Sequence, residues 1–391
     1  MRIVFTGGGT GGHIMPFESI IEAIRMQYTE KQHSIPSFTD PEVLELSFLG
    51  VVTPEGKEFF DRYGVAIHNI PSGKLRRYAS GMNIIDIAFK LPFGTLVALA
   101  RMWSIMPDVV VSKGGYGSIP VILSAIFYRI PILLHESDAT PGRANAFTMR
   151  FASAITLGFA VSREYLQPYL KKIFVTGTPT RTLLAHDQKK ESKKSFGFAE
   201  SEHVLLVMGG SQGAQQINDT LITSLPTLIK DMAIIHITGE AHHVAIAKVA
   251  EEFLAQSPRK QMYKAFARLK GADMTRALMA SDSAVTRAGA SSLAEIARMK
   301  IPALIIPLAG AANDHQRKNA LAFEAAGAAL VLDPSNVTTH LLSQDIERLI
   351  TDQELRTAII KNIEALDFPN AAKDIATLAL ELASGYLPSS K

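Results

Sequence analysis

The stretches MRIVFTGGGTGGHIMP (residues 1–16) and HVLLVMGGSQGAQQIND (203–219) each run from an apolar segment into glycines and then into helix-forming sequence. Short apolar runs alternate with longer helical patterns along the rest of the chain. This alternation predicts βαβ units, and hence parallel sheets covered by helices on both faces. The runs expected to be strands are RIVFT (2–6), ELSFLG (45–50), DVVVS (108–112), PILLHE (131–136), HVLLVM (203–208), AIIHIT (233–238), SAVT (283–286) and ALIIP (303–307).

Length and internal duplication predict two domains. A chain of 391 residues is long for one hydrophobic core, and each half begins with a strand, a glycine loop and a helix. We expect an α/β fold of two Rossmann-like, doubly wound domains, residues 1–177 and 178–370, with a hinge around GTPTRTLL (177–184). The lysine-rich stretch 187–203 is poor in apolar residues, so it is expected at the surface near the boundary.

Composition restricts the functional classes. The formal net charge of +3 suits an anionic ligand or a membrane surface but is too small to argue for nucleic acid. The sequence has no cysteine, which excludes disulfides and thiolate zinc sites and fits a reducing compartment. It also contains no Asp-x-Asp pair and no His-rich spacing, so no other metal site is predicted. The start of the chain lacks a secretory pattern. Charges and prolines interrupt the most apolar tracts, 84–106 and 119–134, so a soluble or peripheral protein is expected.

Glycine and polar clusters follow the predicted strands. Because ligands bind outside the carboxyl ends of strands in open α/β sheets, the clusters predict binding sites, and two facing sheets would form an interdomain cleft. The clusters are GGGTGGH (7–13), KGGYGS (113–118), HESD (135–138), GGSQG (209–213), TGE (238–240), RAGASS (287–292) and PLAGAAND (307–314).

The first glycine loop fits neither common nucleotide motif. Gly7, Gly9 and Gly12 satisfy G-x-G-x-x-G, yet the second strand ends in Gly50 where a nicotinamide cofactor needs an acidic residue. His13 occupies the lysine position of the phosphate-loop pattern, which excludes ATP hydrolysis. What remains is a helix start suited to oxyanions and, in His13, a candidate general base. The alternative for His13 is a surface imidazole.

Three segments of the second half form another candidate site. GGSQGA (209–214) offers backbone N–H groups, TRAGASSLAEI (286–296) places two serines at a helix start, and PLAGAANDHQRKNA (307–320) supplies polar groups suited to sugar hydroxyls, Asn319 among them. The N–H groups could bind phosphate, and Glu295 could accept from ribose hydroxyls. Helix capping is the alternative, because either serine with Glu295 resembles a capping box.

Seven motifs occur in one order: GGTGGH-x-x-P (8–16), GGYGSIPV (114–121), HESD-x-x-PG-x-AN (135–145), G-x-P-x-R (177–181), GGSQGA-x-x-IN (209–218), RAGASSLAEI (287–296) and HQ-x-x-NA (315–320). Through them the chain resembles the MurG family of peptidoglycan N-acetylglucosaminyltransferases, which have the GT-B fold. The resemblance implies transfer of GlcNAc from UDP-GlcNAc to the 4-hydroxyl of MurNAc in undecaprenyl-pyrophosphoryl-MurNAc-pentapeptide. Lipid I becomes lipid II in this step of cell-wall synthesis, with inversion at the anomeric carbon and no cofactor.

The resemblance also assigns site residues by position. His13 is the base candidate, with Glu136 as the second candidate, and Tyr116, Asp138 and Asn145 lie toward the acceptor. The residues implied at the donor are Thr10, Gly11, Gly12, Arg181, Ser211, Gln212, Arg287, Gly289, Ala290, Ser291, Ser292, Leu293, Ala294, Glu295, His315 and Gln316.

The assigned residues also provide for the charge of the leaving group. Two helix starts, together with Arg181 or Arg287, would stabilise the negative charge on the leaving diphosphate without a metal.

Three positions of this chain depart from the family pattern. Asp138 replaces an amide of the family pattern, Thr178 stands in an asparagine position, and Gly117 stands where a larger residue is common.

A lipid-linked acceptor requires membrane contact. SGKLRRY (72–78) and the segment 84–103 combine cations with apolar residues, a combination suited to an anionic leaflet; a pair of core helices is the alternative. The resemblance implies a peripheral position on the cytoplasmic face of the bacterial cell membrane, with cell-wall synthesis or division proteins as candidate partners. It also implies that residues 371–391, with a helix predicted over 371–387, pack back on the first domain.

Other classes share parts of the pattern. A glycosyltransferase acting on diacylglycerol shares much of the donor motif, and a UDP-GlcNAc epimerase shares the fold without needing the basic and apolar patch. The first-half motifs GGTGGH and HESD favour the peptidoglycan enzyme. A nucleotide-sugar binder without activity would not need His13, Glu295 and Gln316 together.

Overall fold

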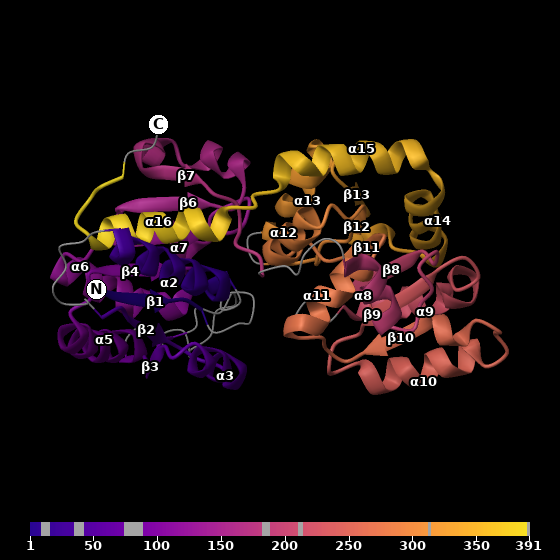
Figure 1. The fold of residues 1–391 in the computed structure, drawn as a ribbon, viewed down its shortest axis with the longest axis horizontal. Coiled ribbons are helices and arrows are strands. Elements are labelled where there is room, and N and C mark those ends of the chain that lie inside the picture. The colour runs from indigo at the N-terminus through magenta and orange to yellow at the C-terminus, as the bar shows by residue number, and fades with distance from the viewer. Residues whose placement is uncertain are drawn as a thin grey trace. The chain divides into compact units, whose positions relative to one another are not determined.

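The computed structural model describes residues 1–8, 16–34, 43–73, 89–181, 188–209, 214–311 and 314–388. The chain forms two compact units (Figure 1). Unit 1 comprises Met1–Thr180 and Phe368–Lys391, and unit 2 comprises Arg181–Asp367. The chain therefore leaves unit 1 once and returns to it once.

Unit 1 contains a seven-stranded parallel sheet in the order β3-β2-β1-β4-β5-β6-β7. Its strands are β1 (Arg2–Thr6), β2 (Glu45–Gly50), β3 (Ala66–Asn69), β4 (Val109–Ser112), β5 (Ile132–Glu136), β6 (Ala154–Leu157) and β7 (Ile173–Val175). The strand order reverses between β1 and β4, and this switch point is where a doubly wound sheet opens a crevice at the carboxyl ends of its strands.

Helices cover both faces of this sheet. They are α2 (Pro16–Ser34), α3 (Pro54–Arg62), α5 (Leu91–Ile105), α6 (Ile119–Tyr128), α7 (Arg143–Met149) and α16 (Ala371–Ala383). Alternate residues of a strand point to opposite faces: Ile3 and Phe5 pack in the core cluster that contains α2 and α16, whereas Val4 packs in the cluster that contains α5 and α6. Both faces of β1 are therefore apolar, as a buried parallel strand requires.

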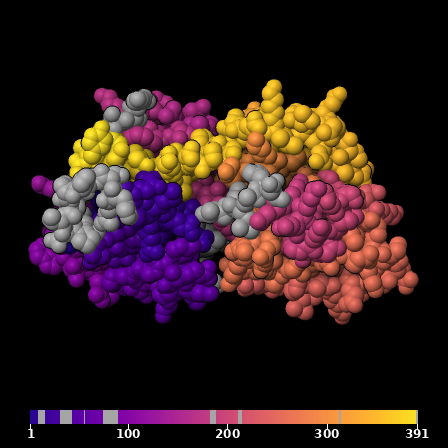
Figure 2. Space-filling model, viewed as in Figure 1, coloured from indigo at the N-terminus to yellow at the C-terminus, as the bar shows by residue number. Residues whose placement is uncertain are grey.

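The helix α16 completes unit 1 from the far end of the chain. Its buried residues, Ile375, Ala379 and Leu382 among them, join the same cluster as Phe17 and Ile21 of α2. Figure 1 shows α16 in yellow beside α2, and Figure 2 shows its yellow surface directly on the indigo residues of the first segment.

Unit 2 contains a six-stranded parallel sheet in the order β10-β9-β8-β11-β12-β13, again with a reversal beside its first strand. Its strands are β8 (Val204–Met208), β9 (Ala233–Ile237), β10 (Tyr263–Phe266), β11 (Ser283–Thr286), β12 (Ala303–Ile305) and β13 (Leu330–Val331). Its helices are α8 (Lys189–Ser195), α9 (Gln215–Leu228), α10 (His243–Leu254), α11 (Gly271–Ala280), α12 (Ala290–Arg298), α13 (His315–Ala325), α14 (Thr339–Thr351) and α15 (Gln353–Ile363). The predicted class, α/β with two doubly wound sheets, is confirmed.

The prediction that the lysine-rich stretch 187–203 lies at the surface is wrong for part of it. Residues 189–195 form α8, and Lys193 is buried with its Nζ 2.8 Å from the Oδ2 of Asp282. The same Nζ donates to the backbone carbonyl of Glu202 at 2.7 Å. The lysine is tolerated inside because a carboxylate and a carbonyl replace its water.

A buried chain of hydrogen bonds crosses unit 2. The Nδ1 of His236 lies 2.8 Å from the hydroxyl of Tyr263, and its Nε2 lies 2.9 Å from the Oδ1 of Asn218. The Nδ2 of Asn218 donates to the carbonyl of Thr238 at 2.9 Å. Since Asn218 accepts through Oδ1, the imidazole must carry its proton on Nε2 and accept from Tyr263. Burial lowers the pKa of His236 to about 3, so the ring is neutral.

Candidate functional site

Close backbone packing brings the loops after β1 and β4 together at the switch point of unit 1. A Cβ on Gly117 would lie 2.9 Å from the carbonyl oxygen of Gly7, and a Cβ on Gly115 would lie 3.0 Å from the Cα of Gly8. The departure of Gly117 from the family pattern thus has a steric reason, because no side chain fits there. The half-buried Tyr116 begins the short 3-10 turn of this loop.

Glu136, the last residue of β5, organises the next loop of unit 1. It is 3% exposed. Its Oε1 accepts from the backbone N–H of Asp138 at 3.0 Å. Its Oε2 accepts from the N–H of Gly142 at 3.1 Å and from the Nδ2 of Asn145 at 2.7 Å. Burial and the charge of Asp138 raise the pKa of Glu136 to about 7, although the hydrogen bonds favour its ionised form.

Lys113 belongs to this site; the sequence placed it in the cluster KGGYGS (113–118) but assigned it no role of its own. It directly follows β4, is 3% exposed, and donates from Nζ to the Oγ of Ser137 at 2.6 Å. Burial lowers the pKa of Lys113 to about 8, whereas the charges of Asp138 and Glu136 act in the opposite direction. The available signal was a lysine placed between a buried strand and two glycines, because lysine is almost never fully buried without a partner.

Asn145 connects the Glu136 loop to the loop after β4. Its Oδ1 is buried and has no hydrogen-bond partner among the described residues. A Cβ on Gly114, whose φ is +75°, would lie 1.5 Å from that Oδ1. The amide therefore occupies space that only glycine leaves open. With Lys113 and Glu136, the amide forms a buried polar cluster at this edge, and Asp138 lies half-buried beside it.

In unit 2, Glu295 of α12 pairs with Arg181. The Nε of Arg181 lies 3.0 Å from the Oε1 of Glu295, and the two side chains are 18% and 11% exposed. Burial raises the pKa of Glu295, and the guanidinium opposes that shift. The Nη1 of Arg181 is buried without a hydrogen-bond partner in the described part of the chain. Because a guanidinium has five N–H donors, Arg181 retains donors for an anionic ligand.

The start of α12 is open to a ligand rather than capped. Gly289 is its N-cap residue, and no described side chain caps the helix. Glu295 pairs with Arg181 instead of reaching back to the first turn, so the capping-box alternative is wrong. The first N–H groups of a helix attract anions when no side chain satisfies them. The donor residues predicted here are Gly289, Ala290, Ser291, Ser292, Leu293, Ala294 and Glu295.

Arg287, just after β11, holds the backbone through its Nη1. It is buried, and its Nη1 donates to the carbonyls of Ile306 at 3.2 Å and Pro307 at 2.9 Å. Burial lowers the pKa of Arg287. Its Nη1 thus joins the ends of β11 and β12, while its Nε is buried without a hydrogen-bond partner among the described residues, as is the Nη1 of Arg181. Both guanidinium groups therefore stay candidates to contact a diphosphate.

Two residues of α13 that were predicted to contact a sugar, Gln316 and Asn319, have different surroundings. The Oε1 of Gln316 accepts from the N–H of Leu308 at 2.9 Å, which orients the amide next to His315. Asn319, expected to offer a polar group to a sugar, is fully buried and donates to the carbonyl of Ala288 at 3.0 Å. That expectation is wrong because Asn319 ties α13 to the loop before α12.

Several predicted positions lie outside the described residues: Thr10, Gly11, Gly12, His13, Ser211 and Gln212. Within the described ranges, no cluster of three or more His, Asp or Glu side chains could hold a metal ion. No helix in those ranges is long and apolar enough to cross a membrane.

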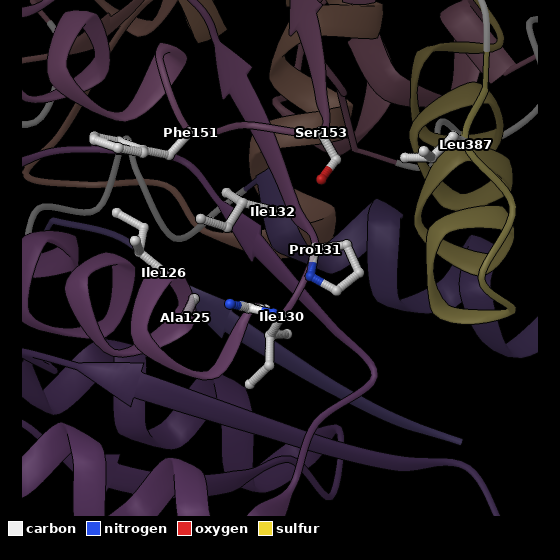
Figure 3. A pocket seen from close by; sticks show the side chains of 9 residues that line it. Ala125, Ile126, Ile130, Pro131, Ile132, Phe151, Ser153 and Leu387 are labelled. Carbon is white, nitrogen blue, oxygen red and sulfur yellow. The ribbon is translucent and has the colours of Figure 1, made fainter.

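A pocket of about 370 Å³ lies at the opposite end of the unit 1 sheet from Glu136 (Figure 3). It is lined by Ile132 at the start of β5, by Phe151 and Ser153 before β6, and by Leu387 after α16. Since ligands of doubly wound sheets bind at the carboxyl ends of the strands, this pocket is not the candidate site.

Solved structures match this fold over almost the whole chain. MurG of Acinetobacter baumannii has a TM-score of 0.71 at 24% identity, covering 97% of this chain and 99% of that one. UDP-GlcNAc 2-epimerase of Neisseria meningitidis, bound to UDP-GlcNAc, has a TM-score of 0.66 at 14% identity, covering 97% and 100%. The model of the glycosyltransferase family 28 N-terminal domain matches residues 39–157, and that of its C-terminal domain matches 204–376. These findings define the class as glycosyltransferases of family 28 with the GT-B fold.

Curated relatives identify the family within that class. A UDP-N-acetylglucosamine–N-acetylmuramyl-(pentapeptide) pyrophosphoryl-undecaprenol N-acetylglucosamine transferase 2 of Bacillus cereus (strain ATCC 10987 / NRS 248) is 33% identical over 92% of this chain and 94% of its own. The transferase of Legionella pneumophila (strain Paris) is 32% identical over 99% and 98%. The chain belongs to this family of N-acetylglucosamine transferases, the MurG family.

Proposed function

We propose that the chain transfers GlcNAc from UDP-GlcNAc to the 4-hydroxyl of MurNAc in undecaprenyl-pyrophosphoryl-MurNAc-pentapeptide, converting lipid I to lipid II. The observation that carries this proposal is the near-full-length similarity to transferases whose names state those substrates. In the reaction the acceptor hydroxyl loses its proton to a base, its oxygen bonds to the anomeric carbon, and the bond from that carbon to UDP breaks. Negative charge therefore grows on the departing diphosphate.

Unit 2 is proposed to bind UDP-GlcNAc. The uncapped start of α12 and the unsatisfied Nη1 of Arg181 support a diphosphate site, because both favour negative charge. Glu295, held by Arg181, would accept from the ribose hydroxyls, and Gln316 with His315 would contact the sugar. Arg287, whose Nη1 holds the backbone after β12 and whose Nε is buried without a hydrogen-bond partner in the described part of the chain, is the second guanidinium proposed near the diphosphate.

Unit 1 is proposed to bind the acceptor. Tyr116, Asp138 and Asn145 would line the acceptor edge, where Glu136 holds the loop. Both carboxylate oxygens of Glu136 already accept hydrogen bonds, and the residue is nearly inaccessible. A general base must reach the proton that it removes, so we assign Glu136 to positioning and His13 to the base.

An exposed apolar stripe on unit 1, which we call the α5 stripe, is proposed to dock on the cytoplasmic face of the cell membrane. Phe93, Leu96 and Trp103 follow helical spacing along one side of α5, Phe89 lies two residues before the helix, and all four are 60–70% exposed. Phe127, 71% exposed, adds to this surface through ring contacts of Tyr128 with Phe127 and Trp103. Arg101 and Arg129 supply cations for an anionic leaflet.

A transfer assay tests the activity. Purified protein is incubated with radiolabelled UDP-GlcNAc and a short-chain lipid I analogue, and labelled disaccharide-lipid is expected. Diacylglycerol is offered in a parallel reaction. Label on diacylglycerol, with none on the lipid I analogue, would overturn the proposal.

Trp103 tests the docking surface because it is the single tryptophan of the chain. With phosphatidylglycerol vesicles, its fluorescence should shift to shorter wavelength, and Phe93→Ser should reduce the bound fraction in vesicle sedimentation. Phe253→Ser is the matched control, since Phe253 is an exposed aromatic on α10 of unit 2. An unshifted emission in the presence of vesicles would contradict docking through α5.

A further inference from the structure

Two carboxylates and one ammonium meet at the acceptor edge of unit 1. Glu136 ends β5 and Asp138 lies two residues beyond it. Lys113 comes directly after β4, and both negative charges act on its ammonium. Lys113 is almost completely buried and donates to Ser137, the residue between the two carboxylates. His135, the neighbouring titratable residue, adds no positive charge, because burial and Lys113 keep its pKa well below the ordinary range.

We propose that Lys113 is a positioning residue for the transfer: its ammonium holds the turn at Ser137 and offsets the charge of Asp138. Glu136 and Asn145 thereby keep their places at the acceptor edge. The inference rests on the proposed function of this edge and adds a residue that the motif resemblance does not assign. Lys113 acts through the loop and does not need to touch the substrate.

The physical reason is the cost of burying charge. A buried ammonium needs partners, and removing one member of such a set leaves the others uncompensated. Without Lys113, the adjacent carboxylates would repel each other, and one would take up a proton more readily. Protonation of Glu136 would remove acceptor capacity from a group that now serves three donors, the N–H groups of Asp138 and Gly142 and the amide of Asn145.

A double-mutant cycle tests the coupling between Lys113 and Asp138. Lys113→Met, Asp138→Asn and the double variant are compared with the full-length enzyme by kcat/KM for the lipid I analogue between pH 6 and 9. Each single change is expected to lower kcat/KM about tenfold. If the two residues are coupled, the double variant should also lose only about tenfold, whereas two independent changes would together lose about a hundredfold. Lys113→Met should move the acid limb of the profile to higher pH, and Lys113→Arg should restore it. If the losses in kcat/KM of the two single variants multiply in the double variant, the two residues act independently and the proposal is wrong.

Folding and pairing are separated by two further measurements. If Lys113→Met does not fold, the double variant is still expected to fold, because it carries neither charge. Its activity is then compared with that of Asp138→Asn. A double variant that also fails to fold would overturn the pairing. Lys193→Met is the matched control, because Lys193 is also buried and forms an ion pair with Asp282 in unit 2. It should lower the unfolding temperature and leave the pH profile unchanged, and an equal shift of the profile in this control would refute a specific role of Lys113.

The result is distinguishable from failure of the proposed function. An unmodified enzyme that transfers no GlcNAc to lipid I would refute the function, yet the coupling of Lys113 with Asp138 would still be measurable in thermal unfolding. An active enzyme with independent Lys113 and Asp138 effects would refute only the present inference.

Discussion

Two buried carboxylates, one in each unit, have opposite surroundings. Glu295 faces a guanidinium, whereas Glu136 faces backbone N–H groups, an amide and the negative charge of Asp138. Burial raises the pKa of both carboxyl groups, but the guanidinium of Arg181 opposes that shift at Glu295, whereas the charge of Asp138 adds to it at Glu136. The surroundings of Glu136 suit a carboxylate that holds a loop and changes protonation near neutral pH.

We predict that Glu295 and His13 separate donor binding from turnover. Glu295→Gln removes the ionic partner of Arg181 and should weaken UDP binding about tenfold or more, measured by calorimetry. His13→Ala should lower kcat by about 10²–10⁴ and leave the Kd for UDP unchanged. His340→Ala, an exposed histidine on α14, is the control. Equal loss of UDP affinity at both sites would refute this division of roles.

Glu136 also makes a prediction for stability against pH. Its pKa is raised from 4.5 to about 7 in the folded protein. Between these values the folded state keeps a proton that the unfolded state releases, so the free energy of unfolding falls as pH rises. Glu136→Gln should reduce the pH-dependent decrease in the free energy of unfolding by roughly 1–3 kcal/mol. Urea unfolding at pH 5 and pH 7.5 checks it, and parallel losses in both proteins would contradict it.

At the residue scale, sequence reasoning found the groups that follow strands but not how they are used. It selected Glu136, which ends β5, and Arg181 and Glu295, which the structure pairs with each other. It assigned Lys113 no role because the partner carboxylates lie on another strand. It misassigned Asn319, because only the fold shows that the amide is buried against a carbonyl.

At the scale of elements, the sequence predicted eight of the strands in the described residues and missed five. The eight expected strands occur, with ends that match or differ by one or two residues. Two of the missed strands, β3 and β6, have four residues, as the predicted β11 has, so length alone does not separate predicted from missed strands. The strand β13 has two residues, β7 has three, and the edge strand β10 is only half-buried. Such segments lack enough alternation or hydrophobicity to be recognised without their neighbours. The helix α8 was missed because Lys193 is buried by a partner that lies far along the chain.

The hydrogen-bond chain of unit 2 makes a prediction at this scale. Asn218→Ala leaves the Nε2–H of His236 and the carbonyl of Thr238 without partners inside the core. The free energy of unfolding should fall by about 1–3 kcal/mol. Asn362→Ala, which removes an exposed hydrogen bond to the carbonyl of Gly327, is the control and should cost less. Denaturant unfolding measures both, and equal losses would contradict the importance of burial.

At the scale of the molecule, the sequence pattern predicted two sheets, but the return of α16 to unit 1 followed only from family resemblance. The pattern of residues 371–383 identifies an amphipathic helix and says nothing of which sheet it covers. The structure assigns it to unit 1 through Ile375 and Leu382. Long-range packing of this kind depends on the complementary surface of α2, and no local signal carries it.

We predict that loss of α16 affects unit 1 selectively. Truncation after Asp367 uncovers the apolar residues that α16 buries, so unit 1 should become sensitive to protease. Unit 2 should survive as a resistant fragment of residues 181–367 that still binds UDP. Deletion of residues 388–391 alone is the control and should leave both units resistant. Limited proteolysis with mass spectrometry tests this, and equal sensitivity of the two units would contradict it.

The place of α16 has a consequence for biosynthesis. Unit 1 begins to leave a ribosome before unit 2 and is completed after it, because its final helix follows the whole of unit 2. At roughly 5–20 residues per second, the interval between Thr180 and Ala383 lasts on the order of ten to forty seconds. During that time the surface of α2 awaiting α16 is open to nascent-chain chaperones, while unit 2 can already fold.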